Sequence, residues 1–143
     1  MASPGLKSTP NNHSYTSIDS FNSQQTDESA LELEEVVGLT TKNASGLASD
    51  PSTGVCAYVA GCVAVVFAVD SGARSYLMVS SRPPKPLSCV ALSRGGGGGY
   101  VAAGESGQQP AILIWDRLTH TLLSTLKGHN YGVSCIDFSP DGR

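Results

Sequence analysis

The chain has 143 residues, of which 40% are apolar and 15% are charged, and its formal net charge is −3. Nucleic-acid and anionic-membrane binders need clustered Lys and Arg, and a membrane helix needs roughly 20 consecutive apolar residues, so the composition argues against both classes. Sixteen glycines and eight prolines favour a turn-rich β protein, and no secretory signal is visible, so the cytosol or nucleus is the expected compartment.

Residues 1–30 are rich in Ser, Thr, Asn and Gln and hold few large apolar side chains. Such a segment cannot bury enough surface to offset its ordering entropy, so we expect a disordered polar tail. Two dipeptides in it, Ser3-Pro4 and Thr9-Pro10, suit a proline-directed kinase, although such dipeptides are common in tails. The folded part is expected to occupy residues 31–143.

Residues 31–38 alternate apolar and acidic side chains before a glycine. A period of two predicts a half-exposed strand. A short helix is the competing interpretation, because Leu and Glu both favour helix.

The segment of about 43–81 is predicted to form one unit of four short strands. Residues 50–54 are Asp, Pro, Ser, Thr and Gly, a strong turn signal, and Gly61 permits a tight turn. Three prolines within 82–86 lack the ladder donor and end the unit. The strands expected here are 46–49, 55–60, 62–68 and 75–80.

Residues of about 87–127 are predicted to form a second four-stranded unit. Its first strand is followed by five glycines, 95–99. A phosphate-binding loop needs a following helix and usually a lysine, whereas this segment leads into a strand, so a flexible hairpin loop is expected. A third unit begins with one strand at about 133–139. The strands expected in the second unit are 87–93, 100–104, 111–115 and 121–126.

The segment 87–93 recurs 46 positions later as 133–139, with a Trp-Asp and a Gly-His pair between the copies. A period in the forties with these pairs is typical of WD-repeat β-propeller blades. We therefore predict an all-β fold, an incomplete WD-repeat β-propeller of about two four-stranded blades plus one strand. The residues expected to define the repeat are Trp115, Asp116, Gly128, His129, Ser139, Pro140, Asp141 and Gly142.

Ring closure is the next question that this pattern raises. Propellers close with roughly four to eight blades, so this ring needs further blades. The chain is therefore expected to be a fragment of a longer scaffold or an incomplete gene model. In a complete ring, the strand at 33–38 would complete the last blade.

Several motifs in order resemble one family of WD-repeat proteins. Residues 33–38 and 57–63 are similar to the start of the propeller in the family of WD-repeat protein 62 and mitogen-activated protein kinase-binding protein 1. Residues 103–111 resemble that family's Thr-Gly-Glu-x-Gly-x-x-Pro-Ala, and 129–133 also match. The resemblance covers about 33–142. The cilia- and flagella-associated WD-repeat proteins share the opening Leu-Glu-x-x-x-Gly and the Gly-Cys, and are the nearest rival.

This resemblance implies a large, non-enzymatic scaffold associated with stress-kinase signalling, spindle poles and centrosomes. It implies other proteins as partners, with kinases and spindle or microtubule-associated proteins as the candidates, and no nucleic acid, membrane or cofactor. The implied location is cytoplasmic, at the cytoskeleton, centrosome or spindle pole. The family's kinase-docking segments lie beyond the matched part, and no binding residue is carried over. A ciliary protein is the alternative, and a regulatory blade domain of an enzyme is a remote one.

The sequence departs from the family pattern at the hydrogen-bonded tetrad of many WD repeats. That tetrad joins an Asp of the hairpin before the Trp strand with a His, a Ser or Thr, and the Trp. Here the hairpin holds Gln108 and Gln109, so the tetrad is expected to be absent or altered. His129 follows Gly128 as in the family, but its partners would lie in another unit. The first unit has Phe67-Ala68 where the second has Trp-Asp.

Catalytic and metal chemistry is not indicated. The histidines are scattered, and neither a Ser-His-Asp order nor a carboxylate pair stands out, so no catalytic, cofactor-binding or metal residue is proposed. Trp115 is expected to be a packed strand residue and Asp116 to cap a turn. The four cysteines form no Cys-x-x-Cys pair and are expected to be small core residues, with a disulfide or metal site as the alternative. They are Cys56, Cys62, Cys89 and Cys135, of which the last two share one position of the repeat.

Overall fold

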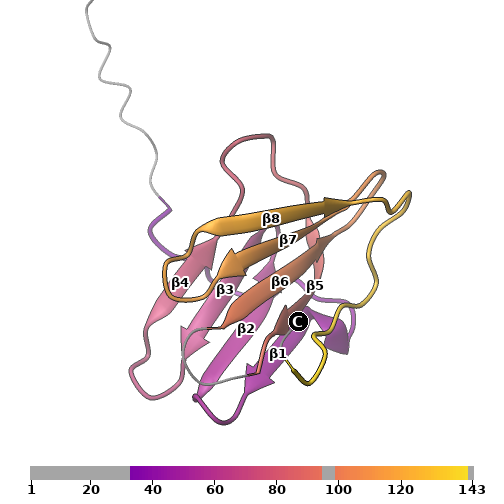
Figure 1. The fold of residues 1–143 in the computed structure, drawn as a ribbon. Coiled ribbons are helices and arrows are strands. Elements are labelled where there is room, and N and C mark those ends of the chain that lie inside the picture. Colours follow the sequence, from indigo (N-terminus) through magenta and orange to yellow (C-terminus); the bar gives the residue numbers. More distant parts are fainter. Residues whose placement is uncertain (1–32, 95–98, 142–143) are drawn as a thin grey trace, which may run out of the picture. The chain divides into compact units, whose positions relative to one another are not determined.

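The computed structural model describes residues 33–94 and 99–141. The predicted tail over residues 1–30, the glycines 95–98 and Gly142 lie outside the described residues. The described strands form two antiparallel sheets, each of four strands in sequence order (Figure 1). This confirms the predicted all-β fold with two four-stranded units, and within the described ranges the two sheets do not close into a ring.

The first sheet begins after a short 3-10 turn, η1 (Ala44–Gly46), which the sequence pattern did not predict. The side chain of Asn43 caps this turn, since its Oδ1 accepts a hydrogen bond from the Ser45 N–H at 3.1 Å. The fourth strand is shorter than expected and ends at Leu77 instead of Ser80. The strands are β1 (Leu47–Asp50), β2 (Val55–Ala60), β3 (Val63–Ala68) and β4 (Arg74–Leu77).

The second sheet has the same order and spacing. Its strands β5 and β6 pair as antiparallel neighbours, as expected for two strands joined by a hairpin across the glycine segment. The strands β6 and β7 are joined by a shorter connection, residues 106–110, which we call the β6–β7 hairpin. The strands are β5 (Leu87–Leu92), β6 (Tyr100–Glu105), β7 (Ala111–Asp116) and β8 (Leu122–Lys127).

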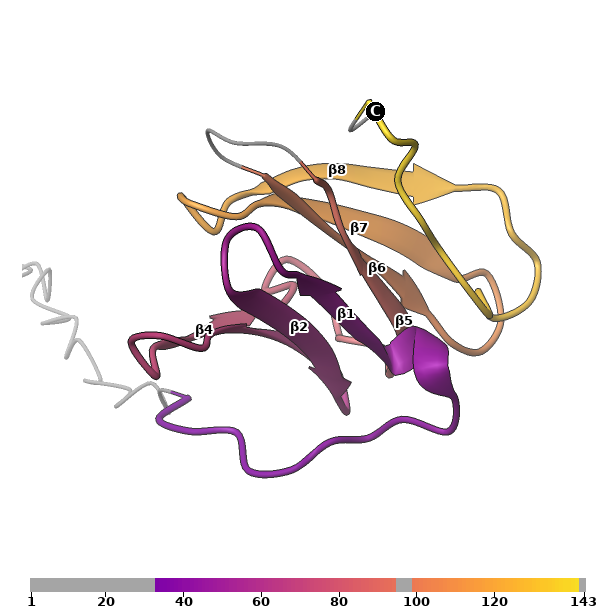
Figure 2. The same cartoon turned by 90° about the horizontal axis from the view of Figure 1, so that it is seen from below.

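The core lies between the two sheets, where β5 packs against β1 and β2. Figure 2 shows the two sheets as adjacent layers with β5 beside β1. Strand β3 is buried along four consecutive residues, which accounts for its unbroken apolar sequence, whereas β7 alternates buried and half-buried residues. Trp115 is 1% exposed within this core, as predicted for a packed strand residue. Its other members include Val59, Leu77, Leu92, Val101 and Leu113.

One hydrogen bond recurs at the start of successive units. The Leu87 N–H donates to the Gly61 carbonyl at 2.8 Å, and the Val133 N–H donates to the Glu105 carbonyl at 2.9 Å. Leu87 and Val133 are the first residues of the two repeated segments. The sequence repeat therefore corresponds to a repeated contact, in which a new unit begins beside the end of the preceding unit's second strand.

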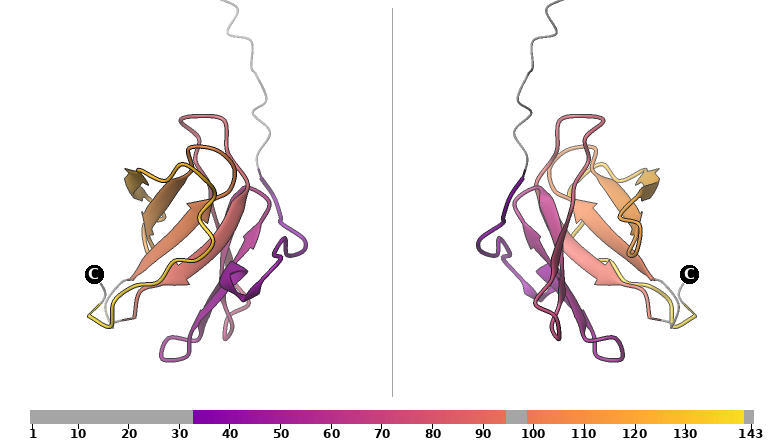
Figure 3. Two further views of the ribbon diagram at one scale, coloured as in Figure 1. Left: turned by 90° about the vertical axis from the view of Figure 1, so that its right-hand side faces the viewer. Right: turned by 90° about the vertical axis from the view of Figure 1, so that its left-hand side faces the viewer.

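Two of the expected strands, at 33–38 and 133–139, are not formed in the described part of the chain. Residues 33–37 and 133–139 belong to no ladder in the part of the chain that the structure describes. A strand is defined by hydrogen bonds to a neighbour, and local alternation cannot supply that neighbour. Val37 is accordingly 89% exposed. Residues 133–141 run along the second sheet (Figure 3), where the Ser88 hydroxyl donates to the Val133 carbonyl at 2.5 Å.

The cysteine prediction holds only in part. Cys89 is buried and Cys135 is exposed, although both occupy the same position of the repeat. Cys89 lies in a paired strand, whereas Cys135 lies in a segment that pairs with no strand among the residues described. Burial raises the pKa of the Cys89 thiol, so this group behaves as a small apolar side chain. No helix among the described residues has the length and apolar character that a membrane span requires.

Candidate functional site

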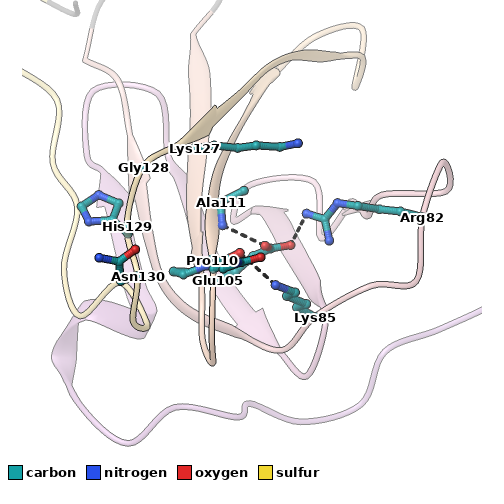
Figure 4. Close-up of a pocket in the computed structure, with 10 residues that line it drawn as sticks. Arg82, Lys85, Glu105, Pro110, Ala111, Lys127, Gly128, His129 and Asn130 are labelled. Carbon is teal, nitrogen blue, oxygen red and sulfur yellow. Dashed lines mark hydrogen bonds and ion pairs between the residues drawn. The ribbon is translucent and has the colours of Figure 1, made fainter.

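A pocket of about 390 Å³ lies at one end of the second sheet. It is formed where the β6–β7 hairpin meets the segment before β5 and the segment after β8 (Figure 4). We call it the basic pocket. Its lining residues are Arg82, Lys85, Glu105, Gln109, Pro110, Ala111, Lys127, Gly128, His129 and Asn130.

Glu105 lies at the centre of the basic pocket, and its side chain is only 2% exposed. Its Oε2 accepts a hydrogen bond from the Ala111 N–H at 2.9 Å, and its Oε1 pairs with the Arg82 guanidinium. A buried carboxylate is tolerated only when it is paired and hydrogen-bonded, and both conditions are met here. Glu105 therefore ties the start of β7 and the segment before β5 to the end of β6.

Two further contacts fix the β6–β7 hairpin. The Lys85 ammonium donates to the carbonyl oxygens of Gln108 at 2.8 Å and Gln109 at 2.9 Å. The Gln109 N–H donates to the Asn130 carbonyl at 3.1 Å. Gln109 has φ 46°, a left-handed backbone that a non-glycine residue holds only when its surroundings impose it. The hairpin is thus held by residues from both neighbouring segments.

The charge in the basic pocket is positive although the chain as a whole is acidic. Three cationic side chains, Arg82, Lys85 and Lys127, face one carboxylate, Glu105, which gives a formal net charge of +2 against −3 for the chain. Among the described residues, the exposed Lys127 ammonium has no hydrogen-bond acceptor. The lining includes no Ser, Thr or Cys nucleophile. The arrangement can hold an anionic group.

The structure separates the predicted repeat residues into three places. Gly128 and His129 line the basic pocket, whereas Trp115 lies in the core towards the other end of β7. Asp116 follows Trp115 and caps the β7–β8 turn as predicted. In the described part of the last turn, the Ser139 hydroxyl donates to the Asp141 carboxylate. Pro140 lies beside them, and Gly142 lies outside the described residues.

Asp116 holds the β7–β8 turn through backbone donors. Its Oδ1 accepts hydrogen bonds from the N–H groups of Leu118 at 2.9 Å and Thr119 at 2.8 Å. These donors, that of Thr119 first, lower the pKa of Asp116 because they favour the charged carboxylate. The role of Asp116 is therefore structural.

A second buried carboxylate, Asp50, lies at the opposite end of the strands from the basic pocket. It accepts hydrogen bonds from the Ser52 and Thr53 hydroxyls, each at 2.6 Å, and from the Ser52 N–H at 3.1 Å. The Arg117 guanidinium, from the β7–β8 turn, lies 3.4 Å from its Oδ2 and links the two sheets. The hydroxyl of Ser52, followed by that of Thr53, lowers the pKa of Asp50 to about 2.

Sequence reasoning did not identify Arg82, Lys85, Glu105 or Lys127 as site residues. Arg82 and Glu105 are 23 positions apart, and no local pattern links them. A usable signal was present in Glu105 itself, a single carboxylate directly after the apolar strand of residues 100–104. Among the described residues, no group of three or more His, Cys, Asp or Glu could hold a metal ion.

Comparison with known proteins identifies relatives but no matching family model. The chain is 40% identical over 112 residues, 78% of its length, to WD repeat-containing protein 62 of Mus musculus. It is 39% identical over 106 residues, 74% of its length, to mitogen-activated protein kinase-binding protein 1 of Mus musculus. It is 29% identical over 114 residues, 78% of its length, to cilia- and flagella-associated protein 52 of Homo sapiens.

These relatives are much longer than the chain. The matched segment spans 7% of each of the two mouse proteins and 18% of the human protein. The similarity therefore concerns one segment of each relative.

Proposed function

We propose that this chain, a homologue of WD repeat-containing protein 62 and mitogen-activated protein kinase-binding protein 1, serves as part of a non-enzymatic protein-interaction scaffold. The proposed setting of this scaffold is stress-kinase signalling and the organisation of the spindle and centrosome. The observation that carries the proposal is the identity of 38–40% over 69–78% of the chain. The second relative is, by its name, a protein that binds a mitogen-activated protein kinase.

The fold supports a binding role. Two packed sheets form a rigid base, and the connections at their ends are displayed as surfaces for other proteins. The basic pocket is lined by three such connections and contains a carboxylate that is fully engaged in internal bonds. These features suit recognition of a partner and supply no group poised for a covalent step.

We further propose that the two sheets are successive propeller blades, over about 43–81 and 87–127, with 133–139 starting the next one. The repeated hydrogen bonds from Leu87 to Gly61 and from Val133 to Glu105 support this division. Closing a ring would need further blades. The proposed partners are kinases and spindle or microtubule-associated proteins, in the cytoplasm and at the centrosome and spindle pole.

Proximity labelling in dividing cells tests this function. The chain is fused to a labelling enzyme, and the matched control is the same fusion carrying Trp115→Ala, which removes a core side chain that is 1% exposed. We expect spindle-pole proteins and stress-kinase components to be enriched with the wild-type fusion and lost with the control. Equal labelling by both fusions would contradict the proposal.

A ciliary role is the second candidate. It rests on the 29% identity over 114 residues to cilia- and flagella-associated protein 52, of which the chain matches 18%. The same fusion expressed in ciliated cells separates the two functions. Enrichment of axonemal proteins without spindle-pole proteins would favour the ciliary role.

A further inference from the structure

We propose that the basic pocket binds an acidic segment of a partner protein, and that the carboxylate side chains of that segment contact the cations of the pocket. This inference rests on the proposed scaffold function and adds the chemistry of the partner. It uses the concave surface at the end of β6 and β8, to which the repeat residues Gly128 and His129 contribute.

The basic pocket carries positive charge from two parts of the chain. Cations come from two separate segments, Arg82 and Lys85 before β5 and Lys127 at the end of β8. Figure 4 shows these side chains arranged around Glu105. The three cations outnumber the single carboxylate, and a concave surface with an excess of one sign of charge attracts ligands of the opposite sign. Although the chain as a whole is acidic, an anionic partner is therefore attracted to this one surface.

Some hydrogen-bond donors of the basic pocket are not used by contacts within the chain. Arg82 is engaged with Glu105, so this pair neutralises itself. Lys85 gives two hydrogen bonds to carbonyl oxygens, and an ammonium has three donors, which leaves one. Lys127, exposed and at the rim, retains all three. The imidazole of His129 and the side-chain amide of Asn130 are further polar groups in the lining. Several separated donors are therefore offered to a ligand.

The cations of the basic pocket suit carboxylate ligands better than a phosphate. Compact phosphate sites typically use arginine forks, which bind two phosphate oxygens at once. The arginine here is already paired with Glu105, so it offers no free fork to a phosphate. Ammonium groups act as separate point charges, and the two lysines come from different segments around a pocket of about 390 Å³. These properties fit carboxylates spaced along an extended segment.

Fluorescence anisotropy with the full chain tests the proposal. The probe is a fluorescein-labelled peptide in which glutamate alternates with serine, and the matched peptides carry glutamine or phosphoserine at the glutamate positions. The variant Lys127→Gln removes the available cation. The control variant Arg94→Gln removes an exposed cation just after β5, at the opposite end of the sheet. Far-UV circular dichroism confirms that both variants remain folded.

We expect the glutamate peptide to bind and the glutamine peptide not to bind. Lys127→Gln should weaken binding about two- to fivefold, in line with an exposed ion pair, and Arg94→Gln should leave it unchanged. Added salt should weaken binding to the wild-type chain, because exposed charges are screened. Equal affinities of Lys127→Gln and the wild-type chain would overturn the proposal, and so would binding of the phosphoserine peptide alone.

The failure of this inference can be told apart from failure of the scaffold function. If the partners recovered by proximity labelling bind Lys127→Gln as well as they bind the wild-type chain, the scaffold function is retained. The basic pocket is then not the site that binds them. Binding of the glutamate peptide without any labelled partner would support the pocket and contradict the scaffold.

Discussion

Two buried carboxylates, Asp50 and Glu105, lie at opposite ends of β7, and each pairs with an arginine from a neighbouring segment. The surroundings of the two pairs differ. Asp50 is saturated by two hydroxyls and a backbone N–H from its own turn, so nothing remains to bind a ligand. Glu105 is enclosed by lysines that outnumber it. One buried ion pair thus joins the two sheets, and the other supports an open, cationic surface.

The largest expected effect is on Glu105. Glu105→Ala leaves the buried Ala111 N–H and the partly exposed Arg82 guanidinium without this acceptor. We expect a loss of about 3 kcal/mol in the free energy of unfolding, measured by urea denaturation. Glu105→Gln keeps an oxygen acceptor and should lose less. A stability equal to wild type for Glu105→Ala would show that the pair contributes nothing to the fold.

A close contact beside Glu105 gives the next effect. A Cβ atom added at Gly104 would lie 2.6 Å from the Cys89 sulfur and 2.7 Å from the Val133 Cβ, both closer than packed atoms tolerate. Gly104→Ala should therefore destabilise the chain by about 1–3 kcal/mol and displace residues 133–141 from the second sheet. Faster hydrogen exchange at the Val133 N–H would show the displacement. Unchanged exchange and stability would mean that the segment is not packed there.

Local pattern predicted most of the strands because each is bounded by a turn signal, such as residues 50–54 or Gly61. Local pattern alone did not form strands at 33–37 and 133–139, where no partner strand is paired with them among the described residues. It also failed to find the two ion pairs. Asp50 and Arg117 are 67 positions apart, so only the packing of the two sheets brings them together. The basic pocket was missed for the same reason.

The contribution of Asp50 to stability is expected to depend on pH. Its pKa of about 2 in the folded chain is below the ordinary value of 3.8, so the carboxylate favours the folded state above pH 3.8. This contribution is lost as the pH falls from 3.8 towards 2. The stability difference between the wild-type chain and Asp50→Asn, measured by urea denaturation, should therefore shrink over this window. A difference that stays constant with pH would contradict the assignment.

The smallest effect separates the two lysines of the basic pocket. Lys85→Gln removes two hydrogen bonds to the β6–β7 hairpin and should lower the free energy of unfolding by about 1 kcal/mol. Lys127→Gln removes no hydrogen bond among the described residues and should change it by less than about 0.5 kcal/mol. Thermal unfolding of the two variants, followed by circular dichroism, measures the difference. If Lys127→Gln proved as destabilising as Lys85→Gln, Lys127 would be part of the structure of the pocket, and its loss could no longer be assigned to partner binding alone.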